Sequence, residues 1–170
     1  MANFKILADK IYQLEGGFVN DPNDRGHATN HGITLATWRK VGYDKDGDYD
    51  IDADDIRKLT KADFLFILRR YYWNRWQADF IKYQSIANIL VDWVWASGKW
   101  GVIIPQKLLN VTADGLVGPE TLYAVNTANH ITLLQQIYNA RINFIENIIK
   151  NDPTQQKFEK GWMRRLGEIK

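Results

Sequence analysis

Apolar residues recur at intervals of three and four positions in one segment after another of this chain. In the first segment they are Phe4, Leu7, Ile11 and Leu14, a spacing that puts all four on one face of a helix. Segments of this kind bury one face of each helix against the others, so the sequence predicts a mainly α fold. Only the region 16–34, rich in Gly, Asn, Asp and Thr, indicates turns and a small β-hairpin.

Capping residues mark several of the predicted boundaries. Thr34, Thr60, Ser85 and Thr154 each precede a helical segment and carry the side-chain oxygen of a helix cap. Asp63 completes a capping box with Thr60. The expected helices are 4–15, 35–38, 61–72, 86–97, 105–110, one that begins at Pro119, 131–149 and 155–169.

Composition excludes several classes of protein. A net charge of +2 is too small to predict nucleic-acid binding, and no run of about 18 apolar residues predicts a membrane-spanning helix. The absence of cysteine rules out disulfides and thiol chemistry. The first residues lack a basic start followed by an apolar run, so we expect no signal peptide.

The first helical segment ends in the run Glu15-Gly16-Gly17. Gly reaches the left-handed backbone conformation cheaply, so the two glycines predict the end of the helix and put Glu15 in its last turn. There the negative end of the helix dipole favours a protonated carboxyl group, as a general acid requires. On this local pattern alone, an ordinary surface glutamate before a helix cap is the simpler interpretation.

Asp24 and Thr29 follow Glu15 in the turn-rich region. A glycosidase needs one carboxylic acid to protonate the leaving oxygen and a second group to activate water or stabilise the cation. Glu15 with Asp24 and Thr29 could supply both functions. Turns also contain Asp for purely conformational reasons, so the spacing alone leaves both interpretations open.

The wider sequence resembles a known family. The run Glu15-Gly16-Gly17-Phe18-Val19-Asn20-Asp21-Pro22, followed by Asp24 and Thr29-Asn30-His31-Gly32-Ile33-Thr34, is similar to the glycoside hydrolase family 108 N-acetylmuramidases. The resemblance implies a lysozyme-like, two-lobed helical fold with a small β-hairpin near the N-terminus. It also implies that Glu15 is the general acid.

The same resemblance assigns roles to residues around Glu15. It implies that Asp24 and Thr29 hold the water, and that Asn20, Asp21 and Thr34 surround the bound substrate. Phe18 departs from the family, which usually has Tyr there, and Arg25 and His27 stand where Pro and Gly are typical. His27 and His31 would share a face only on a helix, and this segment is predicted as turn, so a zinc site is a poor interpretation.

The acidic segment 44–55 has the spacing of an EF-hand calcium loop, which supplies oxygen ligands from alternate positions and from its last residue. Tyr49 stands where the sharp turn normally has Gly, and the final Asp resembles dockerin-type loops. A solvated acidic loop is the alternative, but so many carboxylates without a cation would repel one another. We therefore expect a structural calcium ion, and no cofactor for catalysis. Its ligands would be Asp44, Asp46, Asp48, Asp50 through its carbonyl, Asp52 through water, and Asp55.

Aromatic residues make up 13% of the chain, including seven Trp, and core packing accounts for most of them. Tyr72 and Trp73 are the candidates for stacking on sugar rings. Asp92-Trp93-Val94-Trp95-Ala96-Ser97-Gly98 and the later Asp114-Gly115-Leu116-Val117-Gly118-Pro119-Glu120-Thr121 resemble the peptidoglycan-binding region that accompanies the family, with Ala96 in place of Asn. This resemblance implies that Asp92 binds substrate.

We therefore expect a muramidase region at 1–84, which includes the acidic loop, and a peptidoglycan-binding region at 85–170, packed as one compact unit. The expected function is that of a peptidoglycan hydrolase, an N-acetylmuramidase that cleaves the β-1,4 bond between N-acetylmuramic acid and N-acetylglucosamine. A lytic transglycosylase that uses the same Glu, and a non-catalytic calcium-dependent module for wall binding or secretion, are the alternatives.

We expect a monomer whose partner is peptidoglycan, without nucleic acid and without membrane insertion. As for an endolysin, synthesis would take place in the cytoplasm. A holin-like or other non-classical release would then bring the protein to the periplasmic or extracellular cell wall.

Overall fold

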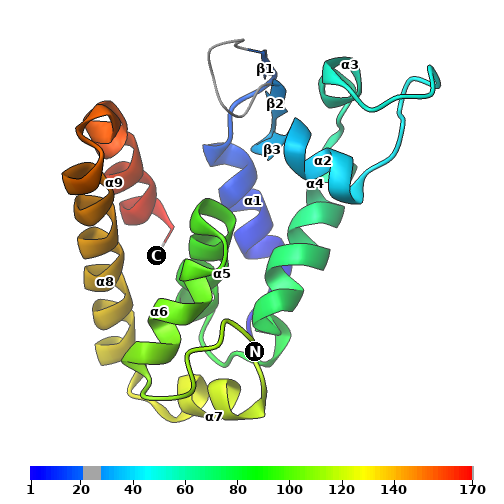
Figure 1. Ribbon diagram of the computed structural model, residues 1–170. Helices are drawn as coiled ribbons and strands as arrows, with labels where there is room; N and C mark the ends of the chain where they lie inside the picture. Colours follow the sequence, from blue (N-terminus) through cyan, green and yellow to red (C-terminus); the bar gives the residue numbers. More distant parts are fainter. Residues whose placement is uncertain (21–27, 170) are drawn as a thin grey trace. The chain divides into compact units, whose positions relative to one another are not determined.

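A computed structural model describes residues 1–20 and 28–169 of the chain (Figure 1). The chain forms two compact units. The smaller unit is Ala8–Ile67, and the larger unit combines Met1–Leu7 with Leu68–Lys170. The fold is mainly helical with a small antiparallel sheet near the N-terminus, as the sequence predicts.

The two compact units are defined by which residues pack together. The predicted regions 1–84 and 85–170 were defined by the positions of sequence motifs. The segment 68–84 lies in the same unit as the helices that come after it. Helix α1 (Phe4–Leu14) contributes residues to both units.

The smaller unit contains a three-stranded antiparallel sheet of order β1-β2-β3. Asn30 of β2 lies opposite Ile33 of β3, and His31 and Gly32 form the loop between them. Their φ angles of 49° and 75° are both positive, as a two-residue hairpin loop of type I′ requires. The elements of this unit after α1 are β1 (Val19–Asn20), β2 (Ala28–Asn30), β3 (Ile33–Thr34), α2 (Leu35–Val41), α3 (Ala53–Arg57) and α4 (Lys61–Ile67).

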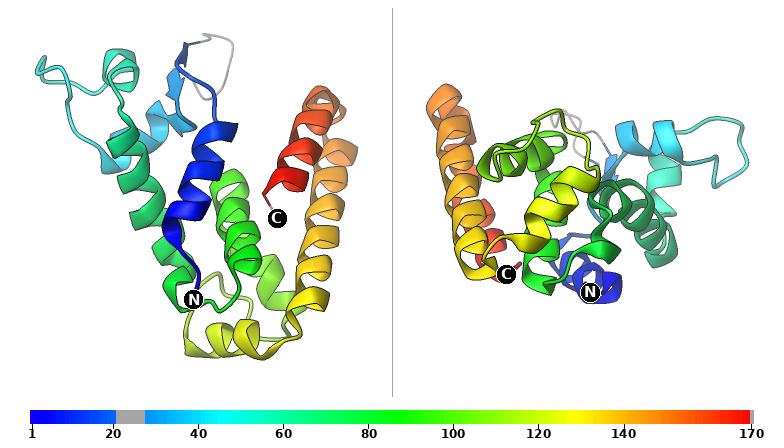
Figure 2. Two further views of the ribbon diagram at one scale, coloured as in Figure 1. Left: turned by 180° about the vertical axis from the view of Figure 1, so that it is seen from behind. Right: turned by 90° about the horizontal axis from the view of Figure 1, so that it is seen from below.

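The larger unit is organised around helix α5, which contacts α6, α8 and η1. Helix α8 has 22 residues, and α9 lies beside it (Figure 2). No helix in the described part of the chain combines the length and apolarity that crossing a membrane requires. The elements are the π-helical turn η1 (Leu68–Trp73), the short 3-10 helices η2 (Asn74–Trp76) and η3 (Ala78–Phe80), α5 (Gln84–Ser97), α6 (Trp100–Leu108), α7 (Pro119–Thr127), α8 (His130–Asn151), the 3-10 helix η4 (Pro153–Phe158) and α9 (Glu159–Glu168).

Helix α5 forms the core of the larger unit because it is apolar on nearly every face. Each residue from Ile86 to Val94 is buried. Gly101 allows α6 to approach α5 closely, because a Cβ at this position would clash with the backbone of Trp93 and Val94.

Asp92 is the buried charge at the centre of this packing. Its side chain has no exposed surface, and it accepts hydrogen bonds from Arg141 of α8 at 3.0 Å and from Arg165 of α9 at 2.7 Å. Arg141 also donates to the carbonyl oxygen of Ile89 at 3.3 Å. Burial lowers the pKa of the Arg141 guanidinium, and the Asp92 carboxylate opposes that shift. One carboxylate therefore joins three helices.

Several predicted helix boundaries are confirmed. Thr34 caps α2 through its hydroxyl group. Thr60 and Asp63 exchange the two hydrogen bonds of a capping box, at 2.7 and 3.3 Å. Helix α5 stops at Gly98, whose φ is 59°, and Pro119 is the first residue of α7.

Other boundaries were predicted wrongly. Helix α5 begins at Gln84, so Ser85 is not its cap. The chain after α8 is capped by Asp152, which accepts from the backbone N–H of Thr154 at 3.1 Å and starts a 3-10 turn. Helix α4 ends at Ile67, and the chain continues to Trp73 as a π-helical turn.

Helix α6 was predicted from Pro105 but begins at Trp100. Pro inside a helix leaves the carbonyl four residues earlier without its helical donor. Here that carbonyl belongs to Gly101, and it accepts from the indole N–H of Trp76 at 3.2 Å instead. This tertiary hydrogen bond compensates for the missing donor, and the local pattern around Pro105 contains no sign of it.

Replacement of Asp92 by Ala tests the role of the buried charge. The change leaves Arg141 buried without its carboxylate, so we expect the free energy of unfolding to fall by about 3 to 5 kcal/mol. Urea unfolding followed by circular dichroism measures it. As a control, Glu168→Ala removes an exposed carboxylate 3.7 Å from Arg164, and we expect a loss below about 1 kcal/mol. Equal midpoints for Asp92→Ala and the wild type would contradict the assignment.

Candidate active site

Glu15 lies directly after the last residue of α1, in the smaller unit. Its side chain is half-buried, and its backbone N–H donates to the carbonyl oxygen of Ile11 at 3.0 Å. Glu15 was predicted in the last turn of the helix, and it lies one residue beyond the observed end of α1 while still hydrogen-bonded to it. Gly16 and Gly17 are outside the left-handed region, so the predicted reason for the two glycines is wrong. Nothing in the structure explains why glycine occupies both positions.

The chain after Glu15 is tied to the sheet. The carbonyl oxygen of Gly16 accepts from the backbone N–H of His31 at 3.2 Å. The His31 ring stacks on Tyr12 of α1, with 4.8 Å between the ring centroids. These two contacts hold the end of α1 against the loop between β2 and β3. Thr29, in β2, lies two residues before His31, so the helix end and this strand are held in one local assembly.

The other residues expected near Glu15 have different surroundings. Asn20 is exposed on β1, opposite Ala28. The Thr34 hydroxyl accepts from the backbone N–H of Thr37 at 3.2 Å, so it is engaged as a helix cap. Asp21, Asp24, Arg25 and His27 lie outside the described residues.

The acidic loop brings its carboxylates together in two groups. Asp44, Asp46 and Asp48 form one, and Asp50, Asp52 and Asp55 form the other, with ligand atoms within 4.8 Å of one another in each group. Tyr49 has a φ of 76° and is 98% exposed, so it adopts the positive φ that favours Gly at this position.

Backbone N–H groups point at the first carboxylate of the loop. Asp44 accepts from Gly47 at 2.6 Å and from Tyr49 at 2.8 Å, and these hydrogen bonds lower the pKa of the Asp44 carboxyl group. Asp46 lies beside it, with Oδ2 3.3 Å from the ammonium group of Lys58. The other oxygen of Asp46, Oδ1, is buried and has no hydrogen-bond partner among the described residues. Oxygen donors of this kind, with one buried oxygen still unpaired, fit a hard cation such as calcium.

Helix α3 connects the acidic loop to the strand next to Glu15. Asp55, the last residue of the loop, is buried in the first turn of α3. The next residue, Ile56, offers its carbonyl oxygen to the side-chain N–H of Asn30 in β2 at 3.0 Å, and both residues are buried. The Arg57 guanidinium lies over the ring of Phe18, 4.5 Å from its centroid. Sequence reasoning missed these contacts, because nothing in the pattern pairs Asn30 or Arg57 with residues so distant in the chain.

Comparison with known proteins identifies the family. The family model of glycosyl hydrolase 108 matches residues 8–98, which include Glu15 and the whole sheet. The chain belongs to the glycosyl hydrolase 108 family. A second family model, described as a predicted peptidoglycan domain, matches residues 100–167.

A solved structure and the curated proteins complete the comparison. The structure of Brucella abortus SagA is similar to this glycosyl hydrolase 108 protein, with a TM-score of 0.80 and 29% sequence identity. The alignment covers 98% of this chain and 90% of that one, and it supports the lysozyme-like fold. No curated protein matches the sequence.

In the larger unit, two expected substrate contacts of this family member need correction. Trp73 is completely buried, packs edge-on against Phe4 and donates its indole N–H to Asp79 at 3.0 Å. Asp92 is equally buried and holds the two arginines described above. Side chains without exposed surface cannot touch a sugar, so both are structural. Tyr72 is half-buried beside Trp95, with 4.7 Å between the ring centroids, and burial raises the pKa of its hydroxyl group.

Asn30→Ala tests the connection between α3 and β2. The substitution leaves the buried carbonyl oxygen of Ile56 without its donor, which costs about 1 to 3 kcal/mol of stability. We expect a matching loss in urea unfolding and faster amide hydrogen exchange in α3. Asn20→Ala, at an exposed position of the same sheet, should change stability by less than about 0.5 kcal/mol. If α3 exchanges at the wild-type rate in Asn30→Ala, the hydrogen bond does not hold it.

Proposed function

We propose that this glycosyl hydrolase 108 protein is an N-acetylmuramidase that cleaves the β-1,4 bond between N-acetylmuramic acid and N-acetylglucosamine. The two family matches support a glycoside hydrolase acting on peptidoglycan. The observation that carries the finer proposal is the placement of Glu15. It is a half-buried carboxyl group at the end of α1, and the chain beside it is fixed to the sheet by the Gly16–His31 hydrogen bond.

In this mechanism Glu15 acts as the general acid. Its carboxylic acid gives a proton to the glycosidic oxygen as the bond to the anomeric carbon breaks, and the positive charge develops on the sugar. A water molecule attacks that carbon and gives its proton to the Asp24 carboxylate, which acts as the general base. We propose that Thr29 positions the water together with Asp24. A separation of roughly 6.5 to 9.5 Å between the carboxyl groups of Glu15 and Asp24 would produce inversion of the anomeric centre.

Four further side chains are proposed to contact the glycan. Asn20 is exposed on β1, and Tyr72 is half-buried. Thr34 would contribute its hydroxyl in addition to capping α2, and Asp21 follows Asn20 in the chain. The site of action would be the cell wall, reached by holin-like or another non-classical release, and the protein would act as a monomer.

Glu15→Gln tests the general acid. The amide keeps the shape of the side chain but cannot donate the proton, so we expect lysis of purified peptidoglycan to fall by about a hundred- to ten-thousand-fold. The matched control is Glu120→Gln, the same substitution at an exposed position of α7. It should lyse at the wild-type rate. Undiminished lysis by Glu15→Gln, or no lysis by the wild type, would defeat the proposal.

We also propose that the acidic loop holds a structural calcium ion. Asp44, Asp46, Asp48, Asp55 and the carbonyl of Asp50 would be its direct ligands, with Asp52 acting through water. The buried, unpaired Oδ1 of Asp46 supports this donor set. The ion would neutralise the repulsion between these carboxylates. It would thereby stabilise the end of the loop from which α3 packs against β2.

Calcium titration tests the ion site. Calcium added to protein freed of metal should bind with measurable heat and, at about a hundred times its dissociation constant, raise the free energy of unfolding by about 2.7 kcal/mol. Asp46→Asn should weaken binding. Asp54→Asn removes the same charge from a side chain that is 65% exposed and lies outside both carboxylate groups, so it should bind as the wild type does. Equal binding by Asp46→Asn and Asp54→Asn would count against these ligands.

A further inference from the structure

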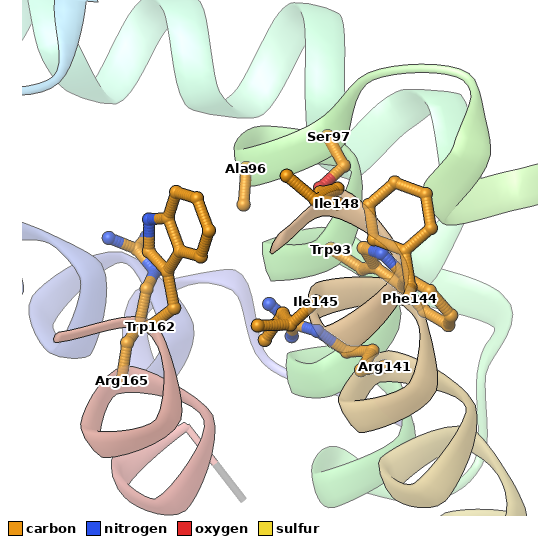
Figure 3. A pocket seen from close by; sticks show the side chains of 9 residues that line it. All are labelled: Trp93, Ala96, Ser97, Arg141, Phe144, Ile145, Ile148, Trp162 and Arg165. Atoms are coloured by element: carbon orange, nitrogen blue, oxygen red, sulfur yellow. The ribbon is translucent and has the colours of Figure 1, made fainter. Parts of the chain in front are cut away.

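A cavity in the larger unit lies between α5, α8 and α9 (Figure 3). Its volume is about 110 Å³. Trp162 projects from α9 on one side, and Phe144 and Ile148 project from α8 on the other (Figure 3). Ala96 and Ser97, at the end of α5, complete the lining, and the exposed Ala96 marks the open side. Pockets that enclose a whole drug-sized ligand run to roughly 300 to 1,000 Å³, so this one fits a single substituent of a larger molecule.

The cavity combines apolar walls with the polar side chains of Arg141, Arg165 and Ser97. Arg165 donates to Asp92 at 2.7 Å. Arg141 is 95% buried and uses only Nη1 in its hydrogen bonds, to Asp92 and to the carbonyl oxygen of Ile89. Its other N–H groups have no hydrogen-bond partner among the described residues, and Arg141 lines the cavity. The Ser97 hydroxyl also has no partner there. An arginine N–H donates only, whereas a hydroxyl both donates and accepts.

Asp92 accepts from both Arg141 and Arg165 and offsets part of their positive charge. The N–H groups of Arg141 that remain without a partner call for a hydrogen-bond acceptor, and a carbonyl oxygen is one. An acetamido group has the required chemistry, with a methyl for the apolar wall, a carbonyl oxygen for Arg141 and an N–H for Ser97. The aromatic face of Trp162 offers a surface for the attached sugar ring. We propose that this cavity binds the acetamido group of an N-acetylated sugar, and so provides a glycan-binding subsite separate from Glu15.

This proposal rests on the proposed function, because it takes the peptidoglycan glycan as the ligand. It adds to that function the position of a second glycan-binding site, between α5, α8 and α9. Helix α5 belongs to the segment matched by the glycosyl hydrolase 108 model, and α8 and α9 belong to the segment matched by the predicted peptidoglycan domain. The Asp92 ion cluster that joins these helices also keeps the walls of the cavity together.

Calorimetric titration of the full chain carrying Glu15→Gln tests the subsite without degrading the ligand. The probes are chitotetraose, which carries an acetamido group on every sugar, and cellotetraose, which carries none. We expect only chitotetraose to bind. Trp162→Ala should weaken binding by at least about tenfold, as loss of a stacking Trp typically does. Ala96→Phe, which fills the cavity from an exposed position, should weaken it similarly. Trp100→Ala removes a partly exposed Trp of α6 outside the cavity and should bind normally.

Several results would overturn the subsite. Wild-type affinity in Ala96→Phe, with the fold confirmed by circular dichroism, would place chitotetraose elsewhere. Equal binding of cellotetraose would show that the cavity does not recognise the acetamido group. Displacement of chitotetraose by a peptidoglycan stem peptide would show that the cavity binds a peptide carboxylate and not a sugar. The lysis assay and the binding assay test the two proposals separately. If Glu15→Gln lyses peptidoglycan fully, the general acid is refuted. Loss of chitotetraose binding in both cavity variants would still support the subsite in that case.

Discussion

The larger unit depends on a single buried carboxylate. Asp92 has no exposed surface, and a charge in such a place is stable only when donors surround it. Arg141 and Arg165 supply those donors from two different helices. The requirement to satisfy one charge therefore fixes α8 and α9 against α5, in a region where apolar packing alone would tolerate other arrangements. The cavity between these helices is lined by both arginines.

In the smaller unit, the feature to explain is how the carboxyl group of Glu15 is held at the end of α1. Two contacts do this, the hydrogen bond from His31 to Gly16 and the stacking of His31 on Tyr12. The buried Asn30 side chain, in β2, connects the sheet to α3 and through it to the acidic loop. A catalytic proton donor benefits from such a setting, since its position is determined by the backbone of the sheet and not by a mobile surface loop.

The sequence predicts most of the helices but few of the side-chain contacts that connect them. Helix periodicity and local caps such as Thr34 and Thr60 are recorded in neighbouring residues, so they could be read directly. Pro105 and Asp92 misled the prediction because their partners, Trp76 for the helix around Pro105 and Arg141 for Asp92, lie far away in the chain. The candidate site follows the same rule. Glu15 was identified from a contiguous run, whereas the hydrogen bonds that hold its surroundings come from distant segments.

The central claim is that the protein is a muramidase, in which water cleaves the bond between N-acetylmuramic acid and N-acetylglucosamine. Digestion of purified peptidoglycan in heavy-oxygen water, followed by mass spectrometry of the muropeptides, tests it most directly. The account predicts one heavy oxygen atom on each new reducing end, located on N-acetylmuramic acid. Anhydro ends without the label would show that the sugar's own hydroxyl attacks, and reducing ends on N-acetylglucosamine would place the cut at the other bond. Either result would contradict the proposed muramidase.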